Sequence, residues 1–227
     1  MSELFDQYRS NYRDVVQSSI DFSGLPHSFF MRSKADLLRD LTARRLGSAR
    51  PAMLDVGCGV GSFHPLLRGM VGSLTGIDVS SESIEQARAD NPGGEYRAFD
   101  GRSFPFDDDS FDIVTAICVL HHVAPAQWTN FINEMRRVAR PGGLICIIEH
   151  NPLNPFTRLA VARCEFDRDA VLLSARKARR LMAASGLQEI GAHHFLLLPW
   201  EAEPARRVEG ALRHIPLGAQ YAAFGTA

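Results

Sequence analysis

From about Pro51 onward, short apolar runs alternate with segments of helical period along most of the chain. A run that is apolar on both of its faces is typical of a strand buried in a parallel sheet. The alternation therefore predicts an α/β fold with a doubly wound, mostly parallel sheet of seven strands. The strands are expected at Ala52–Val56, Ser73–Asp78, Glu95–Phe99, Phe111–Val119, Leu144–Glu149, Glu189–Leu198 and Gln220–Phe224.

Helices are expected between these strands. Ser80 or Ser81 suits a helix start, because a side-chain oxygen can accept from free amides and the acidic residues that follow favour the positive end of the helix dipole. Pro141-Gly142-Gly143 is expected to end another helix and to turn the chain into the next strand. The expected helices are Gly61–Gly69, Ser81–Asn91, Ala126–Ala139, Ser174–Ala184 and Pro204–Arg213.

The segment before Pro51 has a different character. Met1–Leu46 contains helical segments interrupted at residues 21–26 and is too short to form a second domain. We expect residues 1–50 to form a helical cap or lid over the carboxyl edge of the sheet, and residues 51–227 to form the α/β domain. The start is polar and lacks a signal-peptide stretch, and no later run approaches the ~20 apolar residues of a membrane span. A cytoplasmic protein is therefore expected.

The composition limits the kinds of molecule that the protein is expected to bind. The 25 basic and 26 acidic residues leave a net charge of -1, which gives no electrostatic reason to expect a nucleic acid or an anionic membrane as the main partner. The four cysteines contain no CxxC pair, so neither a disulfide framework nor a zinc site is expected. The acidic turn Asp107–Ser110 with Asp112 is interpreted as solvated surface, and no metal site is predicted.

The most specific local signal is a strand that ends in alternating glycines, Leu54–Gly61. Glycine at positions 57, 59 and 61 lets a ligand approach the backbone and permits the positive φ of a tight turn. A glycine turn is also an ordinary connection from a strand to a helix. Asp78, however, ends the next strand about 20 residues after the first glycine, where a carboxylate can accept both hydroxyl hydrogens of a ribose.

These features would also fit a nicotinamide dinucleotide, and the glycine spacing separates the two ligands. The dinucleotide pattern G-x-G-x-x-G places the amino end of a helix against pyrophosphate. Here the third glycine comes one residue sooner, and Asp55 precedes the loop. Asp55 would repel phosphates, whereas it suits a cationic ligand such as the ammonium and sulfonium groups of S-adenosylmethionine.

With these residues the chain resembles the small-molecule type of class I, Rossmann-like S-adenosylmethionine-dependent methyltransferases. The resemblance covers at least Met53–Asn151, and it implies methyltransferase activity with S-adenosyl-L-methionine as the cofactor. It rests on ordered motifs at Leu54–Gly61, Gly76-Ile77-Asp78, Phe99-Asp100-Gly101, Phe111-Asp112-Ile113-Val114, Leu120-His121-His122-Val123 and Arg140-Pro141-Gly142-Gly143.

The resemblance also implies roles at the donor site. Asp78 would bind the ribose hydroxyls and Asp100 the adenine amine, although Asp100 could instead cap the following turn. Two aromatic residues near the N-terminus, Tyr8 and Tyr12, resemble residues that close over the donor, but tyrosines at this spacing also serve as packing. The full implied donor set is Asp55, Gly57, Gly59, Gly61, Asp78, Val79, Phe99, Asp100, Gly101, Ile117, Tyr8 and Tyr12.

Some of these residues keep a second interpretation. The backbone of Gly57 and Ile117 would face the methionine part of the donor. Val79 and Phe99 would pack near the adenine, or they could be core residues without ligand contact.

Histidines follow the two strands whose carboxyl ends should face the acceptor. Methyl transfer from a sulfonium is an in-line displacement, so the protein mainly aligns the reactants, and a base is required only if the acceptor must lose a proton. His150, His121 and His122 are the predicted bases, because imidazole accepts protons near neutral pH. The His-His pair could instead bond backbone carbonyls, and Glu149-His150-Asn151-Pro152 could be a rigid turn.

Taken together, the sequence predicts methyl transfer from S-adenosylmethionine to a small molecule, with a hydroxyl as the favoured acceptor. The apolar segments 29–31 and 196–200 could line the acceptor pocket. The alternative is a non-catalytic protein that binds S-adenosylmethionine or a partner through a methyltransferase-like fold. The intact glycine and acidic positions argue against that alternative.

Overall fold

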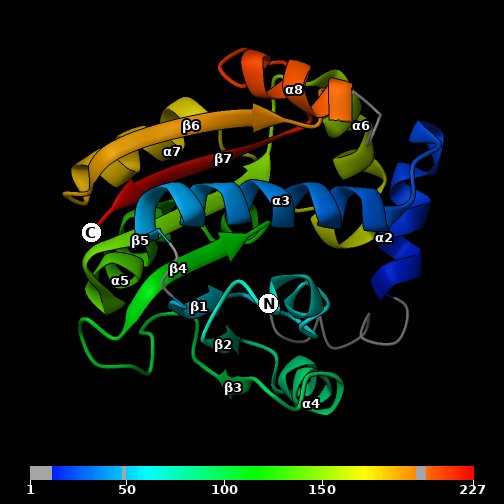
Figure 1. Cartoon of the computed structure of the whole chain (residues 1–227). Helices are drawn as coiled ribbons and strands as arrows, with labels where there is room; N and C mark the ends of the chain where they lie inside the picture. Colours follow the sequence, from blue (N-terminus) through cyan, green and yellow to red (C-terminus); the bar gives the residue numbers. More distant parts are fainter. Residues whose placement is uncertain (1–11, 48–49, 198–202) are drawn as a thin grey trace.

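The computed structural model describes residues 12–47, 50–197 and 203–227 and contains one seven-stranded sheet (Figure 1). The strands are β1 (Ala52–Val56), β2 (Ser73–Asp78), β3 (Glu95–Ala98), β4 (Phe111–Ile117), β5 (Ala139–His150), β6 (Gln188–Phe195) and β7 (Gln220–Thr226). Their order is β3-β2-β1-β4-β5-β7-β6. The pairs from β3 to β5 are parallel, whereas β7 runs antiparallel to both β5 and β6. The mostly parallel α/β sheet of seven strands is confirmed.

Helices cover both faces of this sheet (Figure 1). The α-helices are α2 (Tyr12–Ile20), α3 (His27–Leu46), α4 (Ser81–Asp90), α5 (Trp128–Val138), α6 (Pro155–Arg163), α7 (Ala175–Ala184) and α8 (Glu203–Leu212). Short 3-10 helices are η1 (Asp21–Ser23), η2 (His64–Leu67), η3 (Leu120–His122), η4 (Pro125–Gln127) and η5 (Glu165–Asp167). No helix in the described residues is long and apolar enough to cross a membrane.

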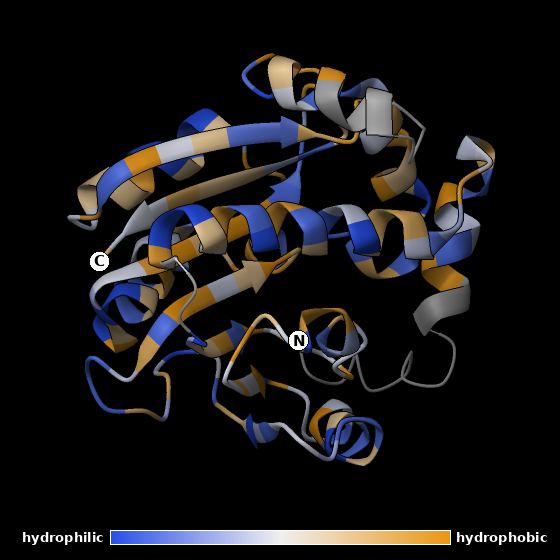
Figure 2. Ribbon diagram, viewed as in Figure 1, coloured by the Kyte–Doolittle hydropathy of each residue, from blue (hydrophilic) through white to orange (hydrophobic). Residues whose placement is uncertain are grey.

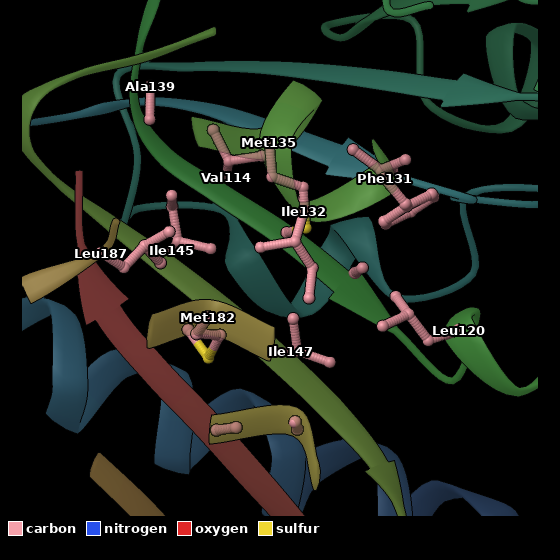
Figure 3. Packing of buried hydrophobic residues seen from close by; sticks show 14 of the residues in the cluster. Val114, Leu120, Phe131, Ile132, Met135, Ala139, Ile145, Ile147, Met182 and Leu187 are labelled. Atoms are coloured by element: carbon pink, nitrogen blue, oxygen red, sulfur yellow. The ribbon is translucent and has the colours of Figure 1, made fainter. Parts of the chain in front are cut away.

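The central strands are buried on both faces, and successive residues belong to different cores. On β5, Ile145 and Ile147 pack against α5 and α7 (Figure 3), whereas Cys146 and Ile148 lie in the cluster that includes α3. All four side chains are fully buried. This is the alternation of a strand between two layers, and apolar residues accordingly run along β4 and β5 in Figure 2.

Helix α3 belongs to the core of the fold. Its residues Phe29, Leu38 and Leu41 are buried in the same cluster as Met53 of β1 and Ile148 of β5. The N-terminal helices are present as expected, and α2, η1 and the beginning of α3 reach the carboxyl edge of the sheet. Most of α3, however, covers a face of the sheet rather than its edge. The division at residue 50 therefore stays a prediction and does not coincide with a boundary of the core.

Three expected elements differ from the structure. The helix expected at Gly61–Gly69 is only the 3-10 helix η2, because Pro65 lies inside it and Gly61 and Gly69 both adopt positive φ. Strand β4 ends at Ile117 instead of Val119, because Cys118 has a φ of 58° and turns the chain. The turn expected at Pro141-Gly142-Gly143 lies within β5, next to a shift in the β4–β5 register.

Helix α6 was not predicted. Its signal is Asn154-Pro155, since the Asn154 side chain accepts a hydrogen bond from the Thr157 amide and proline occupies the first helical turn. No structure was assigned to this segment from the sequence. The cap expected at Ser80 or Ser81 is Ser80, whose side chain accepts from the Ser83 amide.

We predict that Ile132→Ala lowers the free energy of unfolding by about 2–4 kcal/mol. Ile132 is fully buried on α5, between the sheet and the neighbouring helices (Figure 3), so the truncation leaves a cavity. Urea denaturation measures the loss. Leu217→Ala is the control, since Leu217 is 58% exposed and should cost less than about 0.5 kcal/mol. Equal losses in the two variants would contradict this account of the core.

Candidate functional site

A cavity of about 1000 Å³ opens at the carboxyl ends of the parallel strands. The residues that follow β1, β2, β4 and β5 line it, and α2, η1, α3 and α6 contribute further lining residues. This is where an open α/β sheet binds ligands, because the strand order reverses there. The cavity contains most of the residues singled out from the sequence.

The glycine loop after β1 forms one wall of the cavity. Gly57, Gly59 and Gly61 all have positive φ, as expected. A Cβ on Gly57 would lie 2.5 Å from a methyl carbon of Val119, so this glycine is required by packing. Gly57 and Gly59 line the cavity, whereas Gly61 does not: a Cβ there would meet the side chain of Asn91. The structure thus places Gly61 in the support of the loop.

Asp78 ties the glycine loop to the start of α4. Its Oδ2 accepts a hydrogen bond from the Gly59 amide at 2.8 Å, and its Oδ1 accepts from the Ser80 amide at 2.9 Å. Burial raises the pKa of Asp78, and the backbone hydrogen bonds partly oppose that rise. The carboxylate is 9% exposed and lines the cavity at the end of β2. Asp78 thus lies at the end of β2, and its role in binding ribose stays a prediction.

Asp55 lies beneath the loop in a buried polar network. Its Oδ1 accepts from the Thr115 hydroxyl at 2.9 Å, and its Oδ2 lies 3.0 Å from Nε2 of His64. The other ring nitrogen of His64 lies 2.6 Å from the Tyr96 hydroxyl. Both carboxylate oxygens of Asp55 therefore already have hydrogen-bond partners. A cationic ligand would interact with Asp55 electrostatically and would leave these hydrogen bonds in place. His64 was not identified from the sequence as a partner of Asp55, because His64 was placed in an ordinary helix.

The residues predicted near adenine follow β2 and β3. Val79, Phe99, Asp100 and Gly101 all line the cavity. Asp100 is fully exposed, and its Oδ1 accepts from the amides of Arg102 and Ser103, which lowers the pKa of Asp100. Asp100 thus caps the following turn, as the alternative interpretation held. Both bonds use Oδ1, so Oδ2 keeps its capacity to accept.

The remaining predicted donor residues divide into two groups. Ile117, the last residue of β4, lines the cavity. Tyr8 lies outside the described residues. Tyr12 is the first residue of α2, and its side chain also lies outside the part of the chain that the structure describes. Their predicted contact with the donor stays a prediction.

A second polar cluster of the cavity is built around His121. Its Nδ1 lies 2.6 Å from Oε2 of Glu149, whose Oε1 accepts from the amides of Val119 and Leu120. Its Nε2 lies 3.4 Å from Oδ1 of Asp167. His121 is 2% exposed, so a fully buried imidazole sits between two carboxylates.

Two further imidazoles complete this cluster. His122 Nε2 lies 3.3 Å from Oδ1 of Asp167, and the ring centroid of His150 lies 5.1 Å from that of His121. His121, His122 and His150 all line the cavity, so the structure brings the three predicted bases together. Asp167 was missed, because it follows α6 on a segment without a sequence motif.

The histidines differ in protonation. Burial disfavours the charged form of His121, but the charges of Glu149 and Asp167 outweigh it and raise the pKa of His121 well above its usual value. Burial lowers the pKa of His150 to about 4, and the neighbouring His121 charge adds to that shift. At neutral pH His121 is therefore an imidazolium and His150 a neutral imidazole.

Other polar residues of the sequence analysis have structural partners. The Asn151 amide donates to the carbonyls of Pro216 and Gly218, which holds the turn after β5. In the acidic turn, Asp108 pairs with Arg137 and Asp112 pairs with Arg140. Among the described residues, the atoms closest to a metal-ligand arrangement are one each from His121, His150 and Asp167, within 4.8 Å of one another. Both nitrogens of His121 already face carboxylates, which favours an acid–base cluster.

Comparisons with known proteins match part of the chain to a methyltransferase domain. Residues 54–147 match the family model described as a methyltransferase domain. A malonyl-[acyl-carrier protein] O-methyltransferase of Pseudescherichia vulneris is 32% identical over 52% of this chain and 45% of its own length. A phosphatidylethanolamine N-methyltransferase of Cereibacter sphaeroides is 34% identical over 49% of this chain and 57% of its own length. The chain thus spans about half the length of these curated relatives.

A solved structure supports the same fold across the whole chain. A Thermotoga maritima protein described as a SAM-dependent methyltransferase, possible histamine N-methyltransferase, superposes with a TM-score of 0.67 at 19% identity and covers 100% of this chain and 99% of its own. The chain therefore has the fold of the class I methyltransferases, and its residues 54–147 match a methyltransferase domain.

We predict that acid destabilises the wild-type protein more than His150→Gln. Because the folded-state pKa of His150 is about 4 and an unfolded histidine titrates near 6.5, only the unfolded state gains a proton as the pH falls between these values. Stability should therefore fall by about 1–2 kcal/mol more in the wild type between pH 7 and pH 5. Urea denaturation at both pH values measures this, and parallel losses would contradict the assignment of a buried neutral imidazole.

Proposed function

We propose that the chain transfers a methyl group from S-adenosylmethionine to a small-molecule acceptor, and that the accepting atom is a hydroxyl oxygen. One observation carries this proposal: a single cavity joins the glycine loop and Asp78 to the cluster of imidazoles. A donor bound at the loop and an acceptor bound near the imidazoles would share that cavity.

The residues present fit the donor. Gly59 has positive φ, and a Cβ built on it would meet nothing within 4 Å, so the backbone there is open to a ligand. Asp78 would accept the ribose hydroxyls, and Oδ2 of Asp100 would accept from the adenine amine. Val79 and Phe99 would pack against the base. The donor supplies a methyl group on a sulfonium, which is a good leaving group.

The lining of the acceptor side favours an apolar small molecule. Phe29, Phe30 and Met31 of α3 face the cavity, and Leu196 and Leu197 do so from the segment after β6. Such a surface aligns an apolar acceptor and excludes water, which is the main task of the protein in an in-line displacement. A hydroxyl of a sugar-, lipid- or polyketide-derived compound fits this lining. We propose neither a nucleic acid nor a membrane as a partner.

His150 is the preferred proton acceptor in this mechanism. At neutral pH it is uncharged and borders the cavity, so it can accept the hydroxyl proton as the oxygen–methyl bond forms. His121 is the weaker candidate, because it already carries a proton and both its ring nitrogens face carboxylates. His122 is 17% exposed beside Asp167 and is the third candidate base.

The first prediction from this proposal concerns the donor. Asp78→Ala should weaken S-adenosylhomocysteine binding by about 2–3 kcal/mol, because two charge-assisted contacts are lost, whereas Asp100→Ala should weaken it less, because one exposed contact is lost. Calorimetry measures both affinities. Asp90→Ala is the matched control, since Asp90 lies exposed at the end of α4. Unchanged affinity in Asp78→Ala would remove the ribose assignment, and binding of a nicotinamide dinucleotide alone would overturn the donor.

The second prediction concerns the base. Once a screen with methyl-labelled donor has identified an acceptor, His150→Ala should lower kcat by ~10²–10⁴ while melting temperature and donor affinity stay near the wild-type values. His121→Ala should instead lower the melting temperature, because it leaves Glu149 and Asp167 buried without their partner. His122→Ala is the third variant, and the same three quantities are measured for it.

Two outcomes would redirect the mechanism. Near-normal turnover in all three variants at neutral pH would mean that alignment alone suffices and that the acceptor needs no protein base. Donor binding without a methylated product across broad substrate panels would favour the alternative of a non-catalytic S-adenosylmethionine-binding or partner-binding protein.

A further inference from the structure

Lys34 presents a buried ammonium group to the cavity. The residue lies on α3, is 7% exposed and belongs to the cavity lining. The contact of its Nζ is with Sγ of Cys118, at 3.4 Å. It is one of two lysines in the chain, and the other, Lys177, lies exposed on α7.

This ammonium has no carboxylate partner in the part of the chain that the structure describes. The buried carboxylates of Glu149 and Asp167 are both paired with imidazoles. Burial raises the pKa of the Cys118 thiol, so the sulfur is neutral and does not balance the charge. Lysines are almost never buried unless they are paired. A buried, unbalanced cation on the wall of a ligand cavity indicates that a ligand supplies the anion.

A second unsatisfied group lies beside Lys34. Gln220, on β7, is 5% exposed, and its Oε1 is buried without a hydrogen-bond partner. Its Nε2 lies 3.8 Å from Sγ of Cys118 and 3.4 Å from Nδ1 of His150. The Lys34 ammonium and the Gln220 amide therefore flank the same thiol, between the end of β4 and the proposed base. Buried polar atoms without partners are uncommon in native proteins, and the unpartnered Oε1 is an acceptor that a donor group of a ligand would satisfy.

We propose that Lys34 binds a ligand carboxylate in the cavity, and that Oε1 of Gln220 accepts a hydrogen bond from a donor group of the same ligand. The proposal deepens the proposed function, since the carboxylate belongs either to the methionine part of the donor or to the acceptor. Cys118 directly follows Ile117, which was assigned to the donor side, while Gln220 contacts His150 on the acceptor side. The subsite formed by Lys34 and Gln220 therefore lies where the two ligands meet, and both sources use the same chemistry.

Lys34→Met tests the subsite, because it removes the charge and keeps the length of the side chain. If a ligand normally balances this charge, the ligand-free variant should be at least as stable as the wild type, since an unpaired buried charge is replaced by an apolar group. Calorimetry then compares two pairs of probes: S-adenosylhomocysteine with 5′-methylthioadenosine, which lacks the amino acid part, and dodecanoate with dodecanol. Lys177→Met is the matched control.

Each result identifies a source or overturns the proposal. A loss of about tenfold or more in S-adenosylhomocysteine affinity, with 5′-methylthioadenosine unchanged, assigns the subsite to the donor. Loss of dodecanoate binding alone, with dodecanol retained, assigns it to the acceptor. A variant less stable than the wild type, or one that binds all four probes normally, overturns the subsite. Failure of the wild type to bind S-adenosylhomocysteine would instead be a failure of the proposed function.

Discussion

The burial of the central strands on both faces is the constraint on which the rest of this structure depends. Most residues of β1 and β4, and those of β5 from Gly143 to Glu149, are buried, so an unpaired polar group on either face would be costly. Polar side chains therefore collect where the strands end and the backbone leaves the sheet. Asp78, His150 and the η3 histidines all occupy such positions. The position of the site is therefore a consequence of the burial of the central strands.

Once polar groups gather in a buried place, they must satisfy one another. Asp55 does so through His64 and Thr115, and Glu149 does so through His121 and two backbone amides. Each network gives hydrogen-bond partners to a carboxylate that is shielded from water. The two networks have different roles in the cavity. The first supports the donor loop, whereas the second separates one charged imidazole from one neutral imidazole a few ångströms away.

Much of the fold and of the donor site could be predicted from the sequence, because both depend on local patterns. Apolar runs located the seven strands, and the glycine spacing with Asp78 located the loop and its acid. What the sequence did not reveal depends on distant contacts. The proximity of Asp167 to His121, and the burial of Lys34, arise only when α3 and η5 pack at the sheet edge. Proline inside η2 and the Asn154 cap of α6 were local signals, but each also fits a turn.

Val119 lies between the two halves of the site. Its side chain fills the space that a Cβ on Gly57 would need, and its amide donates to the same Glu149 carboxylate that pairs with His121. A shift of the glycine loop would therefore press on Val119 and disturb the hydrogen bonds that orient the imidazole. The loop and the histidine cluster therefore share one residue, with the side chain of Val119 against the loop and its backbone amide on Glu149. A substitution at Val119 would thus act on both parts of the cavity at once.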